Sequence, residues 1–302
     1  MSDTGPNRSA RLAWGAVVAI LLGAVVLVTY ALTHVSTTAT VVEPAVTAPG
    51  ILDAVSTVPA SIFDGVGVTV PDTDLTPPRA VSGPPLTADG KPEVLFIGAE
   101  YGPFCAAERW PLIVALSRFG HFTVLRDATS ADQSVFPGTA TFSFDDAEYT
   151  SPYLTFTGVE LYSDQIGADG TFTRIAKLTA AQSALVARYA STGTSPATGA
   201  SPFVDIAGRM VTTTSGFSPA LLAGQSQAQI ASELDGPPVT TDPASGTTST
   251  PPTGQAIIAA ANELSVGICA ATGQEPSSVC LSKGIRSAAQ ALATSPSATP
   301  VD

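Results

Sequence analysis

Apolar residues follow patterns along this chain that predict a mixed α/β domain. Residues 94–97 read Val-Leu-Phe-Ile, and a short, fully apolar run of this kind is typical of a strand buried at the centre of a sheet. Residues 105–119 carry apolar side chains at helical spacing, so we expect a helix there, with a kink at Pro111. A central strand followed by a turn and a helix is therefore the start of the predicted fold.

Further elements follow from the same patterns. Alternating runs rich in Thr, Phe, Tyr and Val predict strands at 122–125, 139–144, 153–162, 171–173, 203–206 and 210–213. Helical spacing predicts helices at 51–63 (interrupted at Pro59), 179–191, 219–224, 227–234 and 255–266. Asp169 and Gly170 form a hairpin turn signal, and Thr179 suits the N-cap of the helix that follows it.

A long uncharged segment precedes these elements. Residues 12–35 contain no charged side chain and are long enough to span a bilayer, with Trp14 and Tyr30 near the two ends. Arg8 and Arg11 precede the segment, so we expect a single-pass protein of the cell membrane with a cytoplasmic N-terminus and an extracytoplasmic C-terminal domain. A cleaved signal peptide is the alternative, and it exports the same domain.

The chain can be divided by composition and hydropathy into five segments. We expect a cytoplasmic tail at 1–11, a transmembrane helix at 12–35, a Pro/Thr-rich linker with a short helix at 36–90, a folded domain at 91–292 with a mobile loop at 236–254, and a disordered tail at 293–302.

Charge and composition exclude several classes of function. The net charge is −12 and only 13% of residues are charged, which argues against nucleic acid as a partner. With only two histidines, a multi-histidine metal site is not expected, and we expect no cofactor. The carboxylates that could suggest a calcium site lack EF-hand spacing, so we interpret them as solvated loop residues: Asp145, Asp146, Glu148, Asp164 and Asp169. Motifs typical of hydrolases and phosphate-binding loops are absent from the sequence.

The turn after the apolar run carries the motif with chemical meaning. Thiol oxidoreductases place an attacking cysteine at the N-cap of a helix, where the free N–H groups and the helix dipole lower the thiol pKa. A resolving cysteine follows three residues later. In this chain the attacking position is Gly102, Pro103 follows at the first helical position, and Cys105 occupies the resolving position.

A second element supports this interpretation. Ser201 and Pro202 directly precede the apolar strand predicted at 203–206. Thioredoxin-like folds place a cis-proline before such a strand, facing the active-site turn. Most X-Pro bonds are trans, so the expectation of a cis bond at Pro202 rests on the pattern that follows it.

The sequence resembles a thioredoxin-like, membrane-anchored, extracytoplasmic family of unknown function. Members of that family carry Tyr-Cys-Pro-Tyr-Cys-Ala-Ala-Glu-Arg-Trp after the first strand, and residues 101–110 match it except at Gly102 and Phe104. The resemblance extends over residues 51–280. It implies a thioredoxin-like α/β fold, with a central mixed sheet flanked by helices and with an insertion. By analogy with that fold, we expect a groove between the turn and the proline loop to bind an extended peptide, at Tyr101, Gly102, Pro103, Ser201 and Pro202.

The three cysteines leave several interpretations open. Cys269 and Cys280 flank a short loop, and outside the cytoplasm we expect them to form a structural disulfide. A redox-active pair, or pairing of either with Cys105, is the alternative. Cys105 is interpreted as a small buried apolar residue or, alternatively, as a reactive catalytic thiol.

Two functions of different classes follow from these observations. The first is a redox-inactive binding or scaffolding module for an extracytoplasmic protein or peptide, because the motif Gly-Pro-Phe-Cys lacks the attacking cysteine. The second is a single-cysteine thiol–disulfide oxidoreductase that uses Cys105. A purely structural spacer of the cell envelope is a third possibility.

Overall fold

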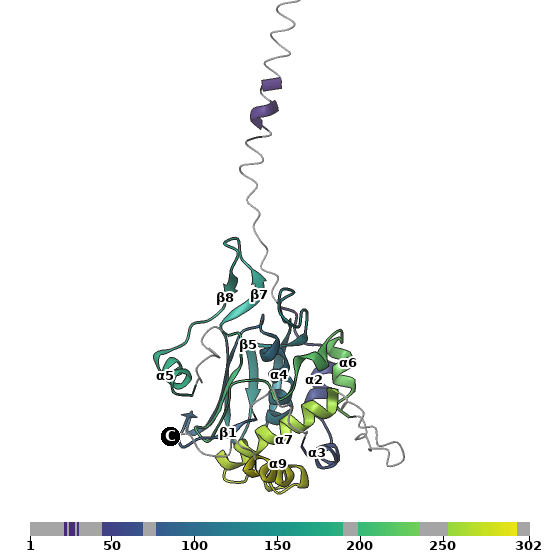
Figure 1. Cartoon of the computed structure of the whole chain (residues 1–302), viewed down its shortest axis with the longest axis vertical. Coiled ribbons are helices and arrows are strands. Elements are labelled where there is room, and N and C mark those ends of the chain that lie inside the picture. Colours follow the sequence, from purple (N-terminus) through teal and green to yellow (C-terminus); the bar gives the residue numbers. More distant parts are fainter. Residues whose placement is uncertain are drawn as a thin grey trace, which may run out of the picture. The chain divides into compact units, whose positions relative to one another are not determined.

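Figure 1 shows a computed structural model of the chain. It describes residues 21, 22, 24–27, 29, 44–68, 77–189, 199–235 and 253–294. The chain divides into two units, Met1–Glu43 and Pro44–Asp302. The described residues of the first unit are helical, but most of the predicted membrane span at 12–35 lies outside the described residues.

Among the described residues, one helix is long and apolar enough to cross a membrane, which is α7, Thr253–Ala271. Of its apolar window, 72% is buried inside the protein. Most of this helix is buried inside the second unit, so its apolar sequence reflects packing in the core.

The centre of the second unit is a mixed β-sheet. Its middle strand β3, Lys91–Gly98, pairs in parallel with β6, Thr155–Glu160, and antiparallel with β9, Phe203–Ile206. β10, Met210–Thr212, continues the sheet beside β9. Two short strands complete it, which are β1 (Arg79–Ala80) and β2 (Thr87–Ala88). The predicted central strand and the two predicted strands after Pro202 are confirmed, and the fold is mixed α/β with a central sheet and flanking helices.

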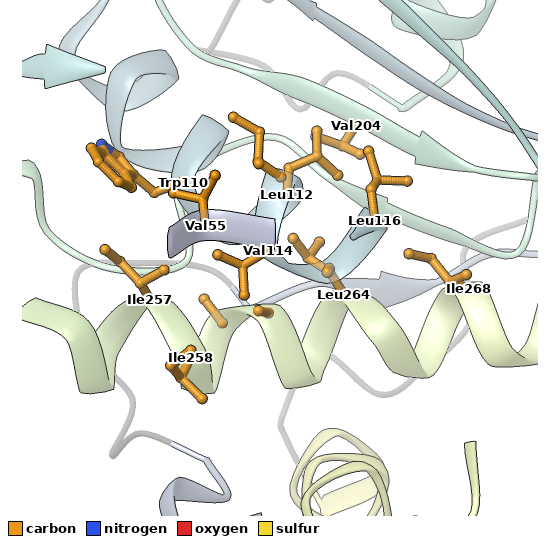
Figure 2. Close-up of a cluster of buried hydrophobic side chains, with 14 of the residues drawn as sticks. Val55, Trp110, Leu112, Val114, Leu116, Val204, Ile257, Ile258, Leu264 and Ile268 are labelled. Atoms are coloured by element: carbon orange, nitrogen blue, oxygen red, sulfur yellow. The ribbon is translucent and has the colours of Figure 1, made fainter. Parts of the chain in front are cut away.

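One face of the sheet is covered by two long helices, α4 (Pro103–Leu116) and α7. Figure 2 shows side chains of α4 lying between Val204 of the sheet and Leu264 and Ile268 of α7. Each of these side chains is at most 1% exposed, and full burial of one such residue contributes about 1.5–3 kcal/mol. This layer therefore holds α4, and the turn before it, in a fixed position on the sheet.

The other face of the sheet carries a separate apolar cluster. Side chains alternate across a strand, so Leu95 and Ile97 point away from α4 and pack with Val186 and Tyr189 of α5, Ala180–Tyr189. Thr179 caps this helix as predicted, since its hydroxyl accepts a hydrogen bond from the N–H of Gln182.

Two antiparallel ribbons lie between α4 and α5 in the sequence. β4 (His121–Thr129) pairs with β5 (Ala140–Thr150), and β7 (Tyr162–Ile166) pairs with β8 (Phe172–Arg174). Gly170 closes the second hairpin with a φ of 77°, as its sequence predicts. Figure 1 shows this hairpin projecting from the domain on the side away from α9.

Two short helices before the sheet are part of the folded unit. α2 (Pro49–Ser56) and α3 (Ala60–Val66) are separated at Pro59, as predicted. Val55 and Phe63 are 1% and 2% exposed, and Asn262 of α7 donates a hydrogen bond to the carbonyl oxygen of Phe63 at 3.0 Å. The folded part of the chain therefore includes residues that the sequence led us to expect in a linker.

The C-terminal part of the described chain is helical. It contains a 3₁₀ helix at Pro219–Leu222, α6 (Gln227–Ser232), α7, α8 (Ser277–Cys280) and α9 (Lys283–Thr294). The predicted disulfide between Cys269 and Cys280 is confirmed, and it joins the end of α7 to α8. Of the loop expected at 236–254, residues 236–252 lie outside the described residues, and α7 begins directly after them.

Candidate functional site

The turn between β3 and α4 carries the sequence motif. β3 ends at Gly98, Gly102 is the N-cap residue of α4, and Pro103 is the first helical residue. The N–H of Gly102 donates to the carbonyl of Ala99 at 3.2 Å, and the carbonyl of Gly102 accepts the N–H of Ala106 at 2.9 Å. Position 102 therefore lies at the positive end of the helix dipole, where a thiolate would be stabilised.

The loop before β9 lies directly against this turn. A Cβ atom at Gly102 would lie 2.9 Å from the carbonyl oxygen of Gly199 and 3.2 Å from that of Ala200. Gly199 has a φ of +75°, and a Cβ there would meet the Cβ of Ala99 at 2.6 Å. The two backbone segments approach this closely because both positions are glycine. A side chain at position 102 would have to displace the loop.

Cys105 lies beneath this contact and is fully buried. Its thiol donates a hydrogen bond to the carbonyl oxygen of Gly199, with a sulfur–oxygen distance of 3.2 Å. Burial raises the pKa of the thiol to about 12, although the positive charge of Arg109 acts in the opposite direction. At neutral pH the sulfur is therefore protonated, shielded from solvent and bonded to the loop, so it is a poor nucleophile.

A buried ion pair lies one turn further along α4. Arg109 donates from Nε and Nη2 to the two carboxylate oxygens of Glu160, at 2.9 and 2.7 Å. Both side chains are completely buried, and the N–H of Phe144 donates a further bond to Glu160 at 3.1 Å. Because Glu160 is the last residue of β6, the pair joins α4 to the sheet beside the turn.

Glu100 adds a second carboxyl group to this buried region. It is 2% exposed, and burial raises its pKa to about 7, with the nearby charges of Glu160 and Asp164 acting in the same direction. A side-chain hydrogen bond with Ser143 and the charge of Arg109 oppose this shift. One oxygen of Glu100 and Nη1 of Arg109 have no hydrogen-bond partner among the described residues. The floor of the turn is therefore polar and incompletely paired.

Aromatic side chains surround the turn at the surface. Tyr101 stacks on Phe172 of β8, with ring centroids 4.2 Å apart and an angle of 5° between the planes. Tyr162 of β7 lies near Tyr101, and Phe104 meets Phe136 edge to face at 6.2 Å. All five rings are half-buried.

Comparison with known proteins identifies the family of this chain. The sequence profile of a domain of unknown function, DUF929, matches residues 78–269, which is more than half of the 302 residues. The chain belongs to the DUF929 family. No protein of curated function and no solved structure matches it. The DUF929 match contains the turn, Cys105 and the loop before β9, and it ends at Cys269, so the second half-cystine lies beyond it.

The structure of this DUF929 member brings the residues predicted from the sequence to one place. Tyr101, Gly102 and Pro103 form the turn, and Ser201 and Pro202 lie in the loop that contacts it, directly before β9. The expected cis bond before Pro202 is wrong, because within the described part of the chain the cis peptide bond is at Pro276, after Glu275.

The sequence of this DUF929 protein did not reveal several residues of the site. The sequence analysis did not predict a role in the site for Glu100, Glu160, Phe172 or Gly199. A charged residue inside a predicted strand, as Glu160 is in 153–162, is a signal of a buried polar contact, but its partner Arg109 is too far away in the sequence to be inferred.

The carboxylates considered for calcium do not gather into one site. Asp145 and Asp146 lie in β5, Asp164 lies in β7, and Asp169 lies in the turn of the β7–β8 hairpin. Among the described residues, no group of three or more His, Cys, Asp or Glu side chains is placed to hold a metal ion.

Proposed function

We propose that this DUF929 protein is a redox-inactive binding module with a thioredoxin-like fold, and that it binds a partner protein at the turn around Gly102. The thioredoxin-like assignment is supported by the strand order β6-β3-β9-β10. In this sheet β6 is parallel to the central strand and β9 antiparallel to it, with α4 directly after the central strand and α7 after β10. This is the strand and helix order typical of thioredoxin-like domains, and the function rests on fold-level analogy to that extent.

The observation that carries the proposal is the state of the two positions that would hold the reactive cysteines. Position 102 is a glycine, and its missing side chain leaves room for the carbonyl of Gly199. The remaining cysteine, Cys105, is buried, has a raised pKa and donates to that same carbonyl. A thiol-exchange enzyme needs an accessible thiolate, and neither position provides one.

Binding is supported by the surroundings of the turn. Ala200 is exposed in the loop beside Gly102, so backbone groups there are accessible to an extended ligand. The half-buried aromatic rings on both sides of the turn supply apolar contact area. A partner segment could therefore be held by backbone hydrogen bonds and ring contacts without any covalent step.

We propose further that the domain is extracytoplasmic and anchored in the cell membrane by the uncharged segment at 12–35. The disulfide between Cys269 and Cys280 supports an oxidising compartment, because such bonds are rare in the cytosol. The positive-inside bias of Arg8 and Arg11 supports a cytoplasmic N-terminus.

Thiol labelling of the full chain in detergent micelles tests the redox part of the proposal. We expect Cys105 to react with iodoacetamide near neutral pH only after denaturation, whereas an Ala200→Cys variant labels at once in the folded protein because residue 200 is exposed. The labelled positions are read by peptide mass spectrometry. Rapid labelling of Cys105 in the folded protein, with formation of a mixed disulfide, would establish the single-cysteine oxidoreductase instead.

A further inference from the structure

Two inserted segments stand on either side of the Gly102 turn. One is the β7–β8 hairpin, whose Phe172 stacks on Tyr101. The other is the loop at 130–139, where the N–H of Ala131 donates to the carbonyl of Tyr101 at 3.0 Å. The hydroxyl of Thr129, just before this loop, donates to Asp164 of the hairpin at 3.2 Å. Both segments are therefore fastened to the turn and form the walls of one surface, which we call the rim.

The rim exposes apolar groups that the protein's core does not use. Tyr101, Phe104, Phe136 and Phe172 belong to neither of the two apolar clusters that fill the domain. In the same segments Val135 is 76% exposed and Ile166 is 49% exposed. Single exposed apolar residues are common, but a set of rings and aliphatic side chains on adjoining segments indicates a contact surface for another molecule.

The charge on the rim is predominantly negative. The walls carry Asp132, Asp164 and Asp169, and Arg174 is their positive side chain. Arg174 is already engaged, because its guanidinium lies 4.5 Å from the ring centre of Tyr162 and donates to the hydroxyl of that residue. Asp169 stays ionised, because hydrogen bonds from Thr171 lower its pKa.

We propose that the rim binds an extended segment of a partner protein in which Lys or Arg alternates with aromatic or aliphatic side chains. The proposal rests on the proposed function, since it names the kind of partner that the same site takes. Apolar side chains of the segment would contact the half-buried rings and the exposed aliphatic groups, and its cations would meet the aspartates on the walls. An acidic segment would be repelled by those aspartates, so the rim distinguishes partners by charge.

Fluorescence anisotropy with labelled peptides tests this proposal on the full chain in detergent micelles. The probes are repeats of Lys-Ser-Phe-Ser, Glu-Ser-Phe-Ser and Lys-Ser-Gly-Ser, which separate the effect of charge from that of the ring. We expect the Lys/Phe peptide to bind at least about tenfold more tightly than either of the others, with a Kd that rises with salt.

Matched variants separate the effect of the rim aspartates on peptide binding from the effect of the protein's overall negative charge. Asp132→Asn with Asp169→Asn should weaken binding of the Lys/Phe peptide about tenfold. Asp53→Asn with Asp89→Asn removes the same charge from exposed positions outside the walls and should leave the Kd unchanged. Ile166→Ser changes an exposed side chain, so it should fold normally and still weaken binding.

The outcomes distinguish the inference from the proposed function. Equal weakening by both pairs of aspartate variants, or equal binding of the Lys/Phe and Lys/Gly peptides, would overturn the inference. If the Glu/Phe peptide binds more tightly than the Lys/Phe peptide and this binding is lost in Ile166→Ser, the claim that the partner segment is basic is overturned. The proposed binding site at the turn would still stand. If none of the peptides binds and Cys105 proves reactive, both proposals fail together.

Discussion

The buried ion pair between Arg109 and Glu160 gives the sharpest prediction about stability. Glu160→Gln keeps the size and shape of the side chain but removes its charge. Arg109 then remains as a buried cation without its partner, because a guanidinium is not deprotonated in proteins and this side chain is completely buried. The amide also points an N–H at one of the two guanidinium donors, so one of the bonds at 2.7 and 2.9 Å becomes a repulsive contact.

The size of the effect follows from the burial of both partners. Removing one partner of a buried pair costs about 3–5 kcal/mol, because the other charge is left uncompensated. The whole free energy of unfolding of a domain is only about 5–15 kcal/mol, so this is a large share of it. For a domain of about 150–250 residues, each kcal/mol corresponds to about 2–4 °C, so we expect the Tm to fall by about 6–20 °C.

The assay is urea unfolding followed by circular dichroism, with a second ion pair of the same protein as control. Arg126 and Asp146 also form a pair, at 3.4 Å, but the side chain of Asp146 is 72% exposed. Asp146→Asn should change the free energy of unfolding by less than about 1 kcal/mol, as exposed pairs contribute little. Adding Arg109→Met to Glu160→Gln should recover part of the lost stability, because the uncompensated charge is then removed.

One result would refute this reasoning. If Glu160→Gln is as mild as Asp146→Asn, the charge of Arg109 must be balanced by another group. Glu100 is the candidate, because its carboxyl interacts electrostatically with Arg109 and has an oxygen without a hydrogen-bond partner among the described residues. A combined Glu100→Gln and Glu160→Gln variant would then show the full loss that the single change does not.

Two further predictions concern α4. Gly102→Cys places its Cβ 3.2 Å from the sulfur of Cys105, so we expect a reducible disulfide between the two residues, detected by mass spectrometry. The Tm should fall, because the carbonyl of Gly199 must move to make room for the new side chain. A variant that stays reduced under oxidising conditions would disprove the assignment of the turn. Burial raises the pKa of Glu108 from 4.5 to about 8, so the folded state holds a proton that the unfolded state has released, and stability should fall as pH rises through this range. Glu108→Gln keeps an acceptor for the N–H of Gly216, so the fall in the free energy of unfolding over this pH range, measured by urea titration, should become smaller by more than about 1 kcal/mol. An unchanged fall would contradict the raised pKa of Glu108.

Much of the fold could be predicted because its signals are local. The apolar run at 94–97, the pair Asp169–Gly170 and the cap at Thr179 each act within a few residues, and each element appears where it was expected. The disulfide between Cys269 and Cys280 is also a short-range contact, so the spacing and the expected compartment were sufficient to predict it.

Two features were missed, which are the helix α9 and the membership of α3 in the folded unit. No helix was predicted at 283–294, although α9 is amphipathic and buries Gly284, Ile285 and Ala288 on one face. α3 belongs to the folded unit because Asn262 and Arg118 bind it, at a sequence separation that no local pattern records. Packing against distant residues therefore decides the place of α3, whereas the amphipathic pattern of α9 was available in the sequence.

The candidate site shows the same division, and it bears on whether a single substitution could give this turn redox activity. The sequence places Gly102 where a thiol oxidoreductase would carry its attacking cysteine, and by itself it shows a difference of one side chain. The structure adds that the carbonyl of Gly199 lies where that side chain would begin and that it also accepts the thiol hydrogen of Cys105. The loop and the helix are thus in direct contact at the place that a side chain at position 102 would occupy. Restoring a cysteine at position 102 would have to open this contact before either sulfur could meet a substrate, so we expect the loop at 199–202, as well as residue 102, to determine whether this turn can exchange disulfides.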